Sequence, residues 1–237
     1  MNLTVDIGNT RTKAALFENG KLERYWYKAT PALLQTVRPY LKNVIVSSVG
    51  ENTGKEWERF APNARFWQLS AQTPLPFANR YATPETLGID RIAAITGAYA
   101  LHPNADCLVI DAGTCITFDL LDAKKGYLGG SISVGLHIRA KALHTFTARL
   151  PLLEDLDRTP LIGNDTKTCI ASGIVNGAVA EIEGIITRYK QEYPHLQVLM
   201  CGGDASFFER QINIPIFVAS DLVHIGLNKI LEHNNAE

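Results

Sequence analysis

The sequence predicts a mixed α/β fold in which one order of elements, β-β-β-α-β-α-β, occurs twice. Short apolar runs rich in β-branched residues alternate with segments of helical period, which is typical of α/β proteins. An Asp-x-Gly turn follows the first apolar run at Asp6 and an equivalent run at Asp111, 105 positions later. The chain has 237 residues, enough for two small domains, which we expect to span residues 1–84 and 85–237.

The first half is expected to open with a buried strand over 3–7 and a hairpin. Strand-like runs over 13–17 and 21–27 flank Asn19-Gly20, and an Asn-Gly pair favours a two-residue hairpin turn because both positions need a positive φ. The remaining elements of this half are a helix over about 31–41, a strand over 44–49, a helix over 54–60 and a strand over 65–69. The proline-rich segment 70–84 predicts a linker or a binding loop.

The second half is expected to begin with a helix that starts at Pro84 and runs to about residue 101. Strands over 107–110, 116–121 and 127–133 follow, and a polar turn separates the last two. Asp165 is expected to cap a long helix whose apolar positions recur with the 3.6-residue period. The last predicted elements are strands over 197–201 and 214–219 and an amphipathic helix over 222–231.

Amino-acid composition and net charge exclude some classes of binding partner. Hydrophobic residues make up 46% of the chain and charged residues 20%, as in an average soluble protein. Lys plus Arg (23) nearly balances Asp plus Glu (24), so we expect neither a nucleic-acid nor a membrane partner that recognises bulk charge. The N-terminus does not resemble a signal peptide, the apolar runs fall short of the roughly 18 residues that span a bilayer, and the four cysteines lack zinc-ligand spacing. We therefore expect a cytoplasmic protein.

The two Asp-x-Gly turns are suited to binding phosphate. A glycine after a strand lets backbone N–H groups approach an oxyanion, and Asn9, Thr10 and Thr114 add side-chain donors. Lys13 could reach a phosphate as a point charge. Asp6 and Asp111 would repel phosphate, but they could hold a cation, or its hydration shell, that bridges to the phosphates.

A single such turn is better explained as an ordinary β-turn in which Asp and Gly favour the turn conformation. The pair at equivalent places favours nucleotide binding. Residues 50–55 superficially match a P-loop, but only three residues separate the glycines, and Glu56 stands where Ser or Thr would bind Mg²⁺. We therefore reject that motif.

Two such halves, each with an Asp-x-Gly turn, resemble the actin-like superfamily of sugar kinases and ATPases, whose two ribonuclease-H-like domains hold the nucleotide in the cleft between them. Within this superfamily the chain resembles the type III pantothenate kinases. The segments that carry the resemblance are 6–10, 87–91, 111–117, 129–135 and 162–166. Their order and spacing extend over essentially the whole chain, and Gly88-Ile89-Asp90-Arg91 is the most discriminating motif.

The resemblance implies ATP-dependent phosphorylation of pantothenate at its primary hydroxyl. The product is 4′-phosphopantothenate, and the reaction is the first step of coenzyme A synthesis. The implied cofactors are ATP, Mg²⁺ and a monovalent cation, K⁺ or NH₄⁺. The resemblance also implies a homodimer, with dimerisation helices in 85–237 and a substrate site shared across the interface.

Asp90 matches the residue that accepts the proton of the pantothenate hydroxyl in this family. A carboxylate aligned on that hydroxyl can take its proton during phosphoryl transfer, although an Asp in a first helical turn also complements the helix dipole. Arg91 could bind the pantothenate carboxylate in a bidentate way, or form a surface salt bridge. Gly88 would leave space for backbone contact. The implied substrate-binding residues are Tyr81, Gly88, Ile89, Asp90, Arg91 and, across the dimer interface, Thr166.

Nucleotide and cation contacts are implied for both turns. Asp111 matches the position that binds the monovalent cation, and Asp6 is assigned to Mg²⁺ through water. The implied ATP-binding residues are Asp6, Ile7, Gly8, Asn9, Thr10, Arg11, Thr12, Lys13 and Thr114. Gly202-Gly203 resembles the superfamily's adenosine-binding turn or a plain strand-end turn.

Simpler alternatives remain for several positions. Tyr81 could be a half-buried loop aromatic, and Thr166 an ordinary first-turn threonine beside the Asp165 cap. The basic side chains over 137–144 are better explained by a solvated helix face than by phosphate binding. Val134 and Cys201 depart from the Pro and Thr usual in the family, which affects the expected loop geometry and no catalytic group.

Two other functions are compatible with the same fold. A phosphatase acting on polyphosphate or a nucleotide would need a residue that aligns water and a basic channel, and the near-neutral charge and the Asp90-Arg91 pair argue against it. A non-catalytic regulatory protein would be favoured by loss of Asp90, Asp6 or Lys13, and all three are present.

Overall fold

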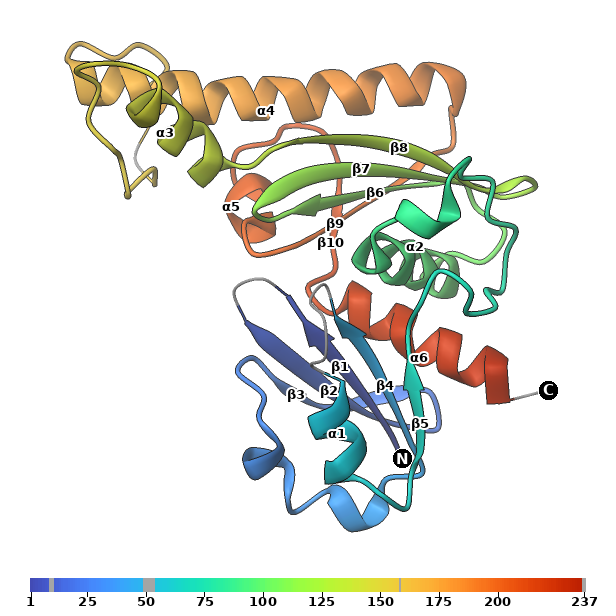
Figure 1. The fold of residues 1–237 in the computed structure, drawn as a ribbon. Coiled ribbons are helices and arrows are strands. Elements are labelled where there is room, and N and C mark those ends of the chain that lie inside the picture. Colours follow the sequence, from blue (N-terminus) through green and yellow to red (C-terminus); the bar gives the residue numbers. More distant parts are fainter. Residues whose placement is uncertain (9–10, 49–53, 158, 236–237) are drawn as a thin grey trace. The chain divides into compact units, whose positions relative to one another are not determined.

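The computed structural model describes residues 1–8, 11–48, 54–157 and 159–235. They form two compact units, each with its own five-stranded sheet (Figure 1). The first unit comprises 1–104, 121–129 and 221–237, and the second comprises 105–120 and 130–220. The N-terminal segment of the first unit therefore extends to residue 104, whereas we expected the first domain to end at 84. It extends further because helix α2 (Ile89–Leu101) packs against helix α6 (Leu222–Asn235) of the same unit.

The first sheet has the strand order β3-β2-β1-β4-β5. The expected hairpin is confirmed, because Asn19 and Gly20 both have positive φ, at 49° and 78°. Strands β1 and β2 pair antiparallel, whereas β1 and β4 pair parallel. The strands are β1 (Asn2–Ile7), β2 (Thr12–Glu18), β3 (Lys21–Trp26), β4 (Asn43–Ser48) and β5 (Arg65–Gln68).

The two faces of this sheet differ in chemistry because side chains alternate along each strand. Leu3 and Val5 of β1 are fully buried in an apolar cluster with Trp57 and Phe60 of helix α1 (Lys55–Phe60). The opposite face carries Thr4 and Asp6, and α6 packs there through polar contacts such as Asn2 to Asn228. The polar residues of β1 therefore share one face, next to α6.

The second sheet has the strand order β10-β9-β6-β7-β8, which repeats the topology of the first sheet. Strand β6 takes the place of β1, so Asp111 is the next-to-last residue of β6 as Asp6 is of β1. The strands are β6 (Cys107–Ala112), β7 (Cys115–Asp122), β8 (Gly126–Val134), β9 (Gln197–Cys201) and β10 (Phe217–Val218). The helices of this unit are α3 (Leu136–Thr145), α4 (Thr166–Glu192) and α5 (Ala205–Glu209).

Helix α4 begins as expected at Asp165. The Asp165 carboxylate accepts a hydrogen bond from the Thr168 N–H at 2.9 Å, and the Thr168 hydroxyl accepts one from the Asp165 N–H at 3.1 Å. This capping box satisfies backbone groups that the first turn leaves unpaired. In length and composition α4 could cross a membrane, and one face of it, from Ile170 to Ile186, is buried in the unit.

Three expected elements are wrong in detail, and proline or glycine explains each. The helix expected over 31–41 is two short 3-10 turns, Pro31–Leu34 and Arg38–Tyr40, because Pro39 restrains Arg38 and lacks an N–H. Only a 3-10 turn follows Pro84, and α2 starts after Gly88, whose ψ of 128° is not helical. The strand expected over 214–219 shrinks to Phe217–Val218, since Pro215 cannot donate to the ladder.

Candidate active site

The first Asp-x-Gly turn joins β1 to β2. Asp6 lies opposite Lys13 in the antiparallel register, so the two side chains project from the same face of the sheet. The Gly8 N–H donates to the Arg11 carbonyl at 3.1 Å, which closes the turn. Asn9 and Thr10, two of the expected ATP contacts, lie outside the described residues. The first unit therefore holds a carboxylate and an ammonium side by side at the end of β1.

The two basic side chains at this turn, Arg11 and Lys13, lie over the ring of Tyr27. The Arg11 guanidinium carbon lies 4.7 Å from the centre of the Tyr27 ring, and Arg11 also donates to the Tyr27 hydroxyl. The Lys13 ammonium lies 5.9 Å from the same centre. An aromatic face attracts cations through its quadrupole, so Tyr27 holds both side chains near the turn.

Asp6 has an unusual protonation equilibrium. Burial raises its pKa from 3.8 to about 6, the Lys13 ammonium lowers it in part, and the charge of Asp90 raises it. Asp90 thus lies close enough to Asp6 for the two carboxylates to repel each other. A site that holds two carboxylates at neutral pH favours a bound cation.

Asp6→Asn is expected to stabilise the protein by roughly 2 kcal/mol at pH 7.5. Because the folded pKa is raised from 3.8 to about 6, wild-type stability falls as pH rises through this range. The amide does not titrate, so its advantage should be larger at pH 7.5 than at pH 5. Urea unfolding of the metal-free protein measures this, with the exposed Glu23→Gln as control; an advantage independent of pH would contradict it.

Asp90 and Arg91 lie in the first turn of α2. The Asp90 carboxylate accepts a hydrogen bond from the Arg91 N–H at 2.9 Å. A Cβ on Gly88 would lie 2.5 Å from the same carboxylate oxygen, so glycine at this position makes room for the Asp90 side chain itself. The structure thus gives the space at Gly88 to the Asp90 side chain, and the backbone contact of Gly88 with substrate stays a prediction.

Arg91 and Tyr81 are brought together. Arg91 is 8% exposed, and its guanidinium carbon lies 5.6 Å from the centre of the Tyr81 ring. Tyr81 itself is half-buried. Predicted site residues of the first unit thus form two contacting groups, Asp6 with Lys13 and Tyr81 with Asp90 and Arg91, and the charge of Asp90 acts on Asp6.

The second Asp-x-Gly turn joins β6 to β7 in the second unit. The Gly113 N–H donates to the Cys115 carbonyl at 2.9 Å, and the Gly135 N–H donates to the Thr114 carbonyl at 3.1 Å. Gly202 has a φ of 97°, and a Cβ there would lie 2.4 Å from an Asp111 carboxylate oxygen. The turn at Asp111, Gly135 and the Gly202 turn, which are far apart in the sequence, are thus packed together.

Thr166 lies elsewhere on the second unit, at the exposed start of α4. It lines an open hollow of about 660 Å³ together with Leu143, Leu150, Cys169 and Ile170. Near this hollow the expected basic side chains of α3 are exposed at His137, Lys141 and His144, whereas Arg139 pairs with Glu181 of α4.

The sequence reasoning missed His224 of α6. This side chain is buried, its Nδ1 lies 2.8 Å from the Thr4 hydroxyl, and its ring packs edge-on against Tyr25. Burial and the Lys13 charge lower its pKa to about 3, so it is neutral beside the Asp6 face of the sheet. The spacing of His224 with the buried Leu227 and Leu231 follows the helical period and could have marked it as inward-facing.

Comparisons with solved structures support the predicted fold class. A Campylobacter jejuni protein assigned to the Baf family of transcriptional activators aligns with 99% of this chain and 100% of its own, at a TM-score of 0.64 and 23% identity. A glucokinase from an Antarctic psychrotroph aligns over 98% of both chains at a TM-score of 0.54 and 12% identity. The two-sheet fold predicted from the repeat is therefore confirmed, and these solved structures share it.

Sequence comparisons specify the family. The family model described as type III pantothenate kinase matches residues 2–188. Type III pantothenate kinases of Bacteroides fragilis and Phocaeicola vulgatus are 43% and 40% identical to this chain, and each alignment covers 99% of both proteins. Together with the paired Asp-x-Gly turns and the Asp90-Arg91 helix start, these matches show that the chain belongs to the type III pantothenate kinase family.

Proposed function

We propose that this protein transfers the γ-phosphoryl group of ATP to the primary hydroxyl of pantothenate, giving 4′-phosphopantothenate for coenzyme A synthesis. The observation that carries the proposal is that Lys13 lies opposite Asp6 on the sheet and that the charges of Lys13 and Asp90 both act on Asp6 within one unit. A phosphate-binding turn and a carboxylate base next to each other are what phosphoryl transfer to an alcohol requires. Family membership supplies pantothenate as the acceptor.

Asp90 accepts the proton of the attacking hydroxyl in this proposal. The hydrogen bond from the Arg91 N–H fixes the carboxylate, and the space at Gly88 accommodates it. Arg91 binds the pantothenate carboxylate, and Tyr81, Gly88 and Ile89 line the same site. The buried guanidinium supports this role, since a desolvated cation interacts strongly with a carboxylate.

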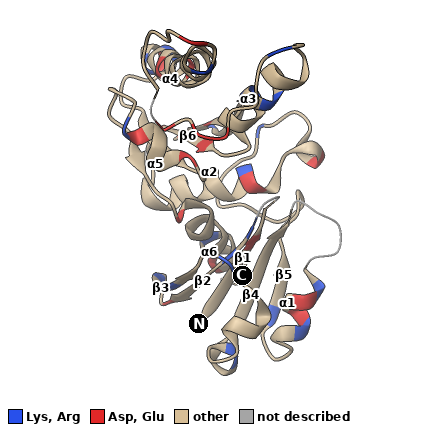
Figure 2. Ribbon diagram, turned by 90° about the vertical axis from the view of Figure 1, so that its left-hand side faces the viewer, with Lys and Arg blue, Asp and Glu red and all other residues tan. Residues whose placement is uncertain are grey.

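ATP binding involves the run from Asp6 to Lys13 together with Thr114. Acidic and basic residues are mixed along elements such as α1 (Figure 2), which supports phosphate binding by local groups over binding by a broad basic surface. The desolvated Asp6 carboxylate fits a hydrated Mg²⁺, which when bound would neutralise charge on the phosphates. Asp111 binds the monovalent cation, K⁺ or NH₄⁺.

ATP consumption measured with and without pantothenate tests the proposal. Turnover that depends on pantothenate, with 4′-phosphopantothenate as product, is the expected result. ATP hydrolysis that is independent of pantothenate would favour a phosphatase or NTPase of the same fold. Absence of turnover with every metal and monovalent cation tried would favour a regulatory protein.

A homodimer formed through the α4 face belongs to the same proposal. Four small residues, Gly173, Gly177, Ala180 and Gly184, are exposed along one side of α4 at helical spacing. Phe146, Leu161 and Ile162 are 85%, 77% and 84% exposed in the same unit. Small residues allow close helix approach, and exposed apolar side chains favour association. Thr166 would then contribute to the partner's substrate site.

Gly177→Arg is expected to convert the dimer to a monomer. A Cβ at Gly177 meets nothing within 4 Å in the single chain, so the substitution does not disturb the unit itself. Light scattering after gel filtration measures the mass, thermal unfolding checks the fold, and Gln191→Arg on the last turn of α4 is the control. A Gly177→Arg protein that stays dimeric would contradict the assignment of this face.

We also propose that the protein acts in the cytoplasm. The buried face of α4 supports this location, since its isoleucines at 170, 174, 182 and 186 pack in the core of its unit. Fractionation of cells that express the tagged chain would test it, and recovery in the membrane fraction after a salt wash would contradict it.

A further inference from the structure

The segment that carries Tyr81 has little secondary structure of its own. Between β5 and α2, residues 69–83 contain only an isolated bridge at Asn79, and the Pro84–Thr86 turn follows. A segment without a helix or a strand must be fixed by contacts elsewhere if it is to present a side chain precisely. These contacts come from the hairpin end of β7 and β8, residues 121–129, which groups with the same unit.

Tyr127 forms the backbone part of this attachment. Its N–H donates to the Ala78 carbonyl, and its carbonyl accepts from the Arg80 N–H, both at 2.9 Å. The Asn79 side chain then accepts a hydrogen bond from the Tyr81 N–H at 3.0 Å. The backbone of 78–81 is thus fixed on both sides of Asn79, directly before Tyr81.

The hairpin has the residues needed for this close approach. Gly126 has a φ of 90°, and a Cβ there would lie 2.0 Å from the Ala78 carbonyl oxygen. Gly129 has a φ of 104°, and a Cβ there would lie 3.3 Å from the Tyr81 ring. Side chains at these positions would separate the hairpin from 78–81, so glycine is required for contact as well as for backbone conformation.

The Tyr127 ring completes the contact. Tyr127 is 2% exposed, and its ring stacks on that of Tyr81 at 6.0 Å between centres and 16° between planes. Tyr81 in turn faces the Arg91 guanidinium. Tyr127, Tyr81 and Arg91 therefore form a continuous stack that begins in the core and ends at the proposed pantothenate site.

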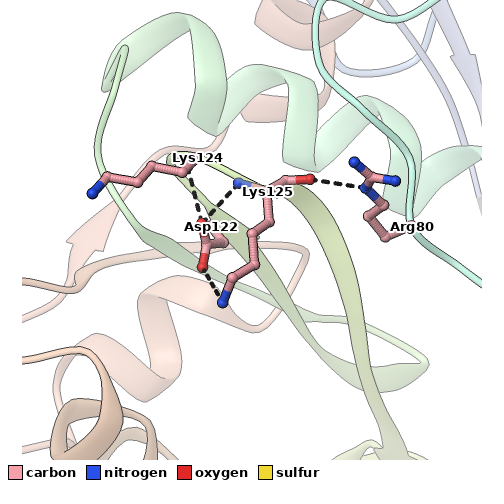
Figure 3. Close-up of polar contacts among 4 residues, drawn as sticks. All are labelled: Arg80, Asp122, Lys124 and Lys125. Atoms are coloured by element: carbon pink, nitrogen blue, oxygen red, sulfur yellow. Dashed lines mark hydrogen bonds and ion pairs between the residues drawn. The ribbon is translucent and has the colours of Figure 1, made fainter.

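Asp122 shapes the turn of this hairpin (Figure 3). Its carboxylate accepts hydrogen bonds from the Lys124 and Lys125 N–H groups, both at 2.9 Å, and pairs with the Lys125 ammonium at 3.3 Å. Burial would raise the pKa of Asp122, but these hydrogen bonds and the ammonium lower it overall. The Lys125 carbonyl then accepts from the Arg80 side chain at 3.4 Å, which adds a second link to 78–81.

We propose that Tyr127 is a positioning residue for pantothenate binding, and that the hairpin 121–129 is the platform that holds Tyr81 and Arg91 in their binding geometry. This inference rests on the proposed function of Tyr81 and Arg91. Tyr127 does not touch substrate. It acts by removing conformational freedom from 78–81 before the substrate arrives, so that binding does not have to order the segment.

Tyr127→Leu is expected to raise the KM for pantothenate about tenfold, as loss of an aromatic pair would. The KM for ATP and kcat should change less than about threefold, because the ATP-binding turn and Asp90 are untouched. Tyr127→Phe keeps the ring and should restore the wild-type KM. Phe118→Leu, an equal truncation at a fully buried site of β7, controls for general loosening of the core.

Asn79→Ala provides a second test that leaves the core intact. Loss of the acceptor for the Tyr81 N–H should also raise the KM for pantothenate, and Asn79→Asp should restore it. Faster hydrogen exchange over 78–81 in Asn79→Ala, measured without substrate, is expected as well. A pantothenate KM unchanged in both Tyr127→Leu and Asn79→Ala, or raised equally by Phe118→Leu, would overturn the inference. Failure of the proposed function would differ, since the wild-type protein would then show no pantothenate-dependent turnover.

Discussion

Asp90→Asn is expected to lower kcat by at least roughly 10²-fold, the low end of what a general base contributes, while ATP affinity stays nearly unchanged. The amide keeps the oxygen that accepts the Arg91 N–H, so the first turn of α2 should be preserved. The substitution removes only the ability to take a proton. Steady-state kinetics with saturating pantothenate and equilibrium binding of ATP measure the two effects separately.

The effect of Asp90→Asn on the neighbouring Asp6 carboxylate does not explain a fall in turnover. Asp90 raises the pKa of Asp6, so loss of the Asp90 charge leaves Asp6 more fully ionised at neutral pH. A fall in turnover therefore cannot be caused by protonation of Asp6. Glu85→Gln, an exposed acid five residues earlier in the chain, is the matched control and should keep wild-type turnover. Wild-type kcat in Asp90→Asn would remove Asp90 from the role of proton acceptor.

Much of the fold could be predicted because local patterns and the global topology agree. The Asn19-Gly20 turn, the Asp165 cap and the repeated Asp-x-Gly turns each specify backbone geometry within a few residues. The helix expected over 31–41 was wrong because a proline at its start is compatible with a helix, whereas Pro39 within it is not. The grouping of α2 with α6 could not be predicted, since it depends on packing between segments more than 100 residues apart.

In the candidate site, too, features set by local sequence could be predicted, whereas contacts between distant segments could not. Residues within one motif, such as Gly88, Asp90 and Arg91, could be predicted together, because their spacing fixes their positions on α2. His224 and Tyr127 were missed because their partners, Thr4 and Tyr81, are distant in the sequence and no local pattern connects them. The close approach of Gly126 to Ala78 and of Gly129 to Tyr81 likewise depends on packing between distant segments, which no local pattern reveals.

Lys13→Met is expected to lower kcat/KM for ATP by at least roughly 10²-fold, as loss of one group that stabilises transition-state charge does. Met has nearly the same length and is apolar, so the β2 strand should keep its pairing with β1. Lys13→Arg should restore part of the loss, because it keeps the charge but not the compact ammonium. Lys21→Met, at the exposed start of β3, is the control, and a change of less than about threefold is expected there.

The pH dependence of Lys13→Met gives an independent readout, because Lys13 also acts on Asp6. The ammonium lowers the pKa of Asp6, which burial has raised to about 6. Without the ammonium that pKa must rise further, so Asp6 becomes protonated at higher pH. Since kcat/KM reports ionisations of the free enzyme, its acidic limb should move to higher pH in Lys13→Met and stay in place in Lys21→Met. An unchanged acidic limb, combined with a large loss of kcat/KM, would assign Lys13 to phosphate binding alone and separate it from the ionisation of Asp6.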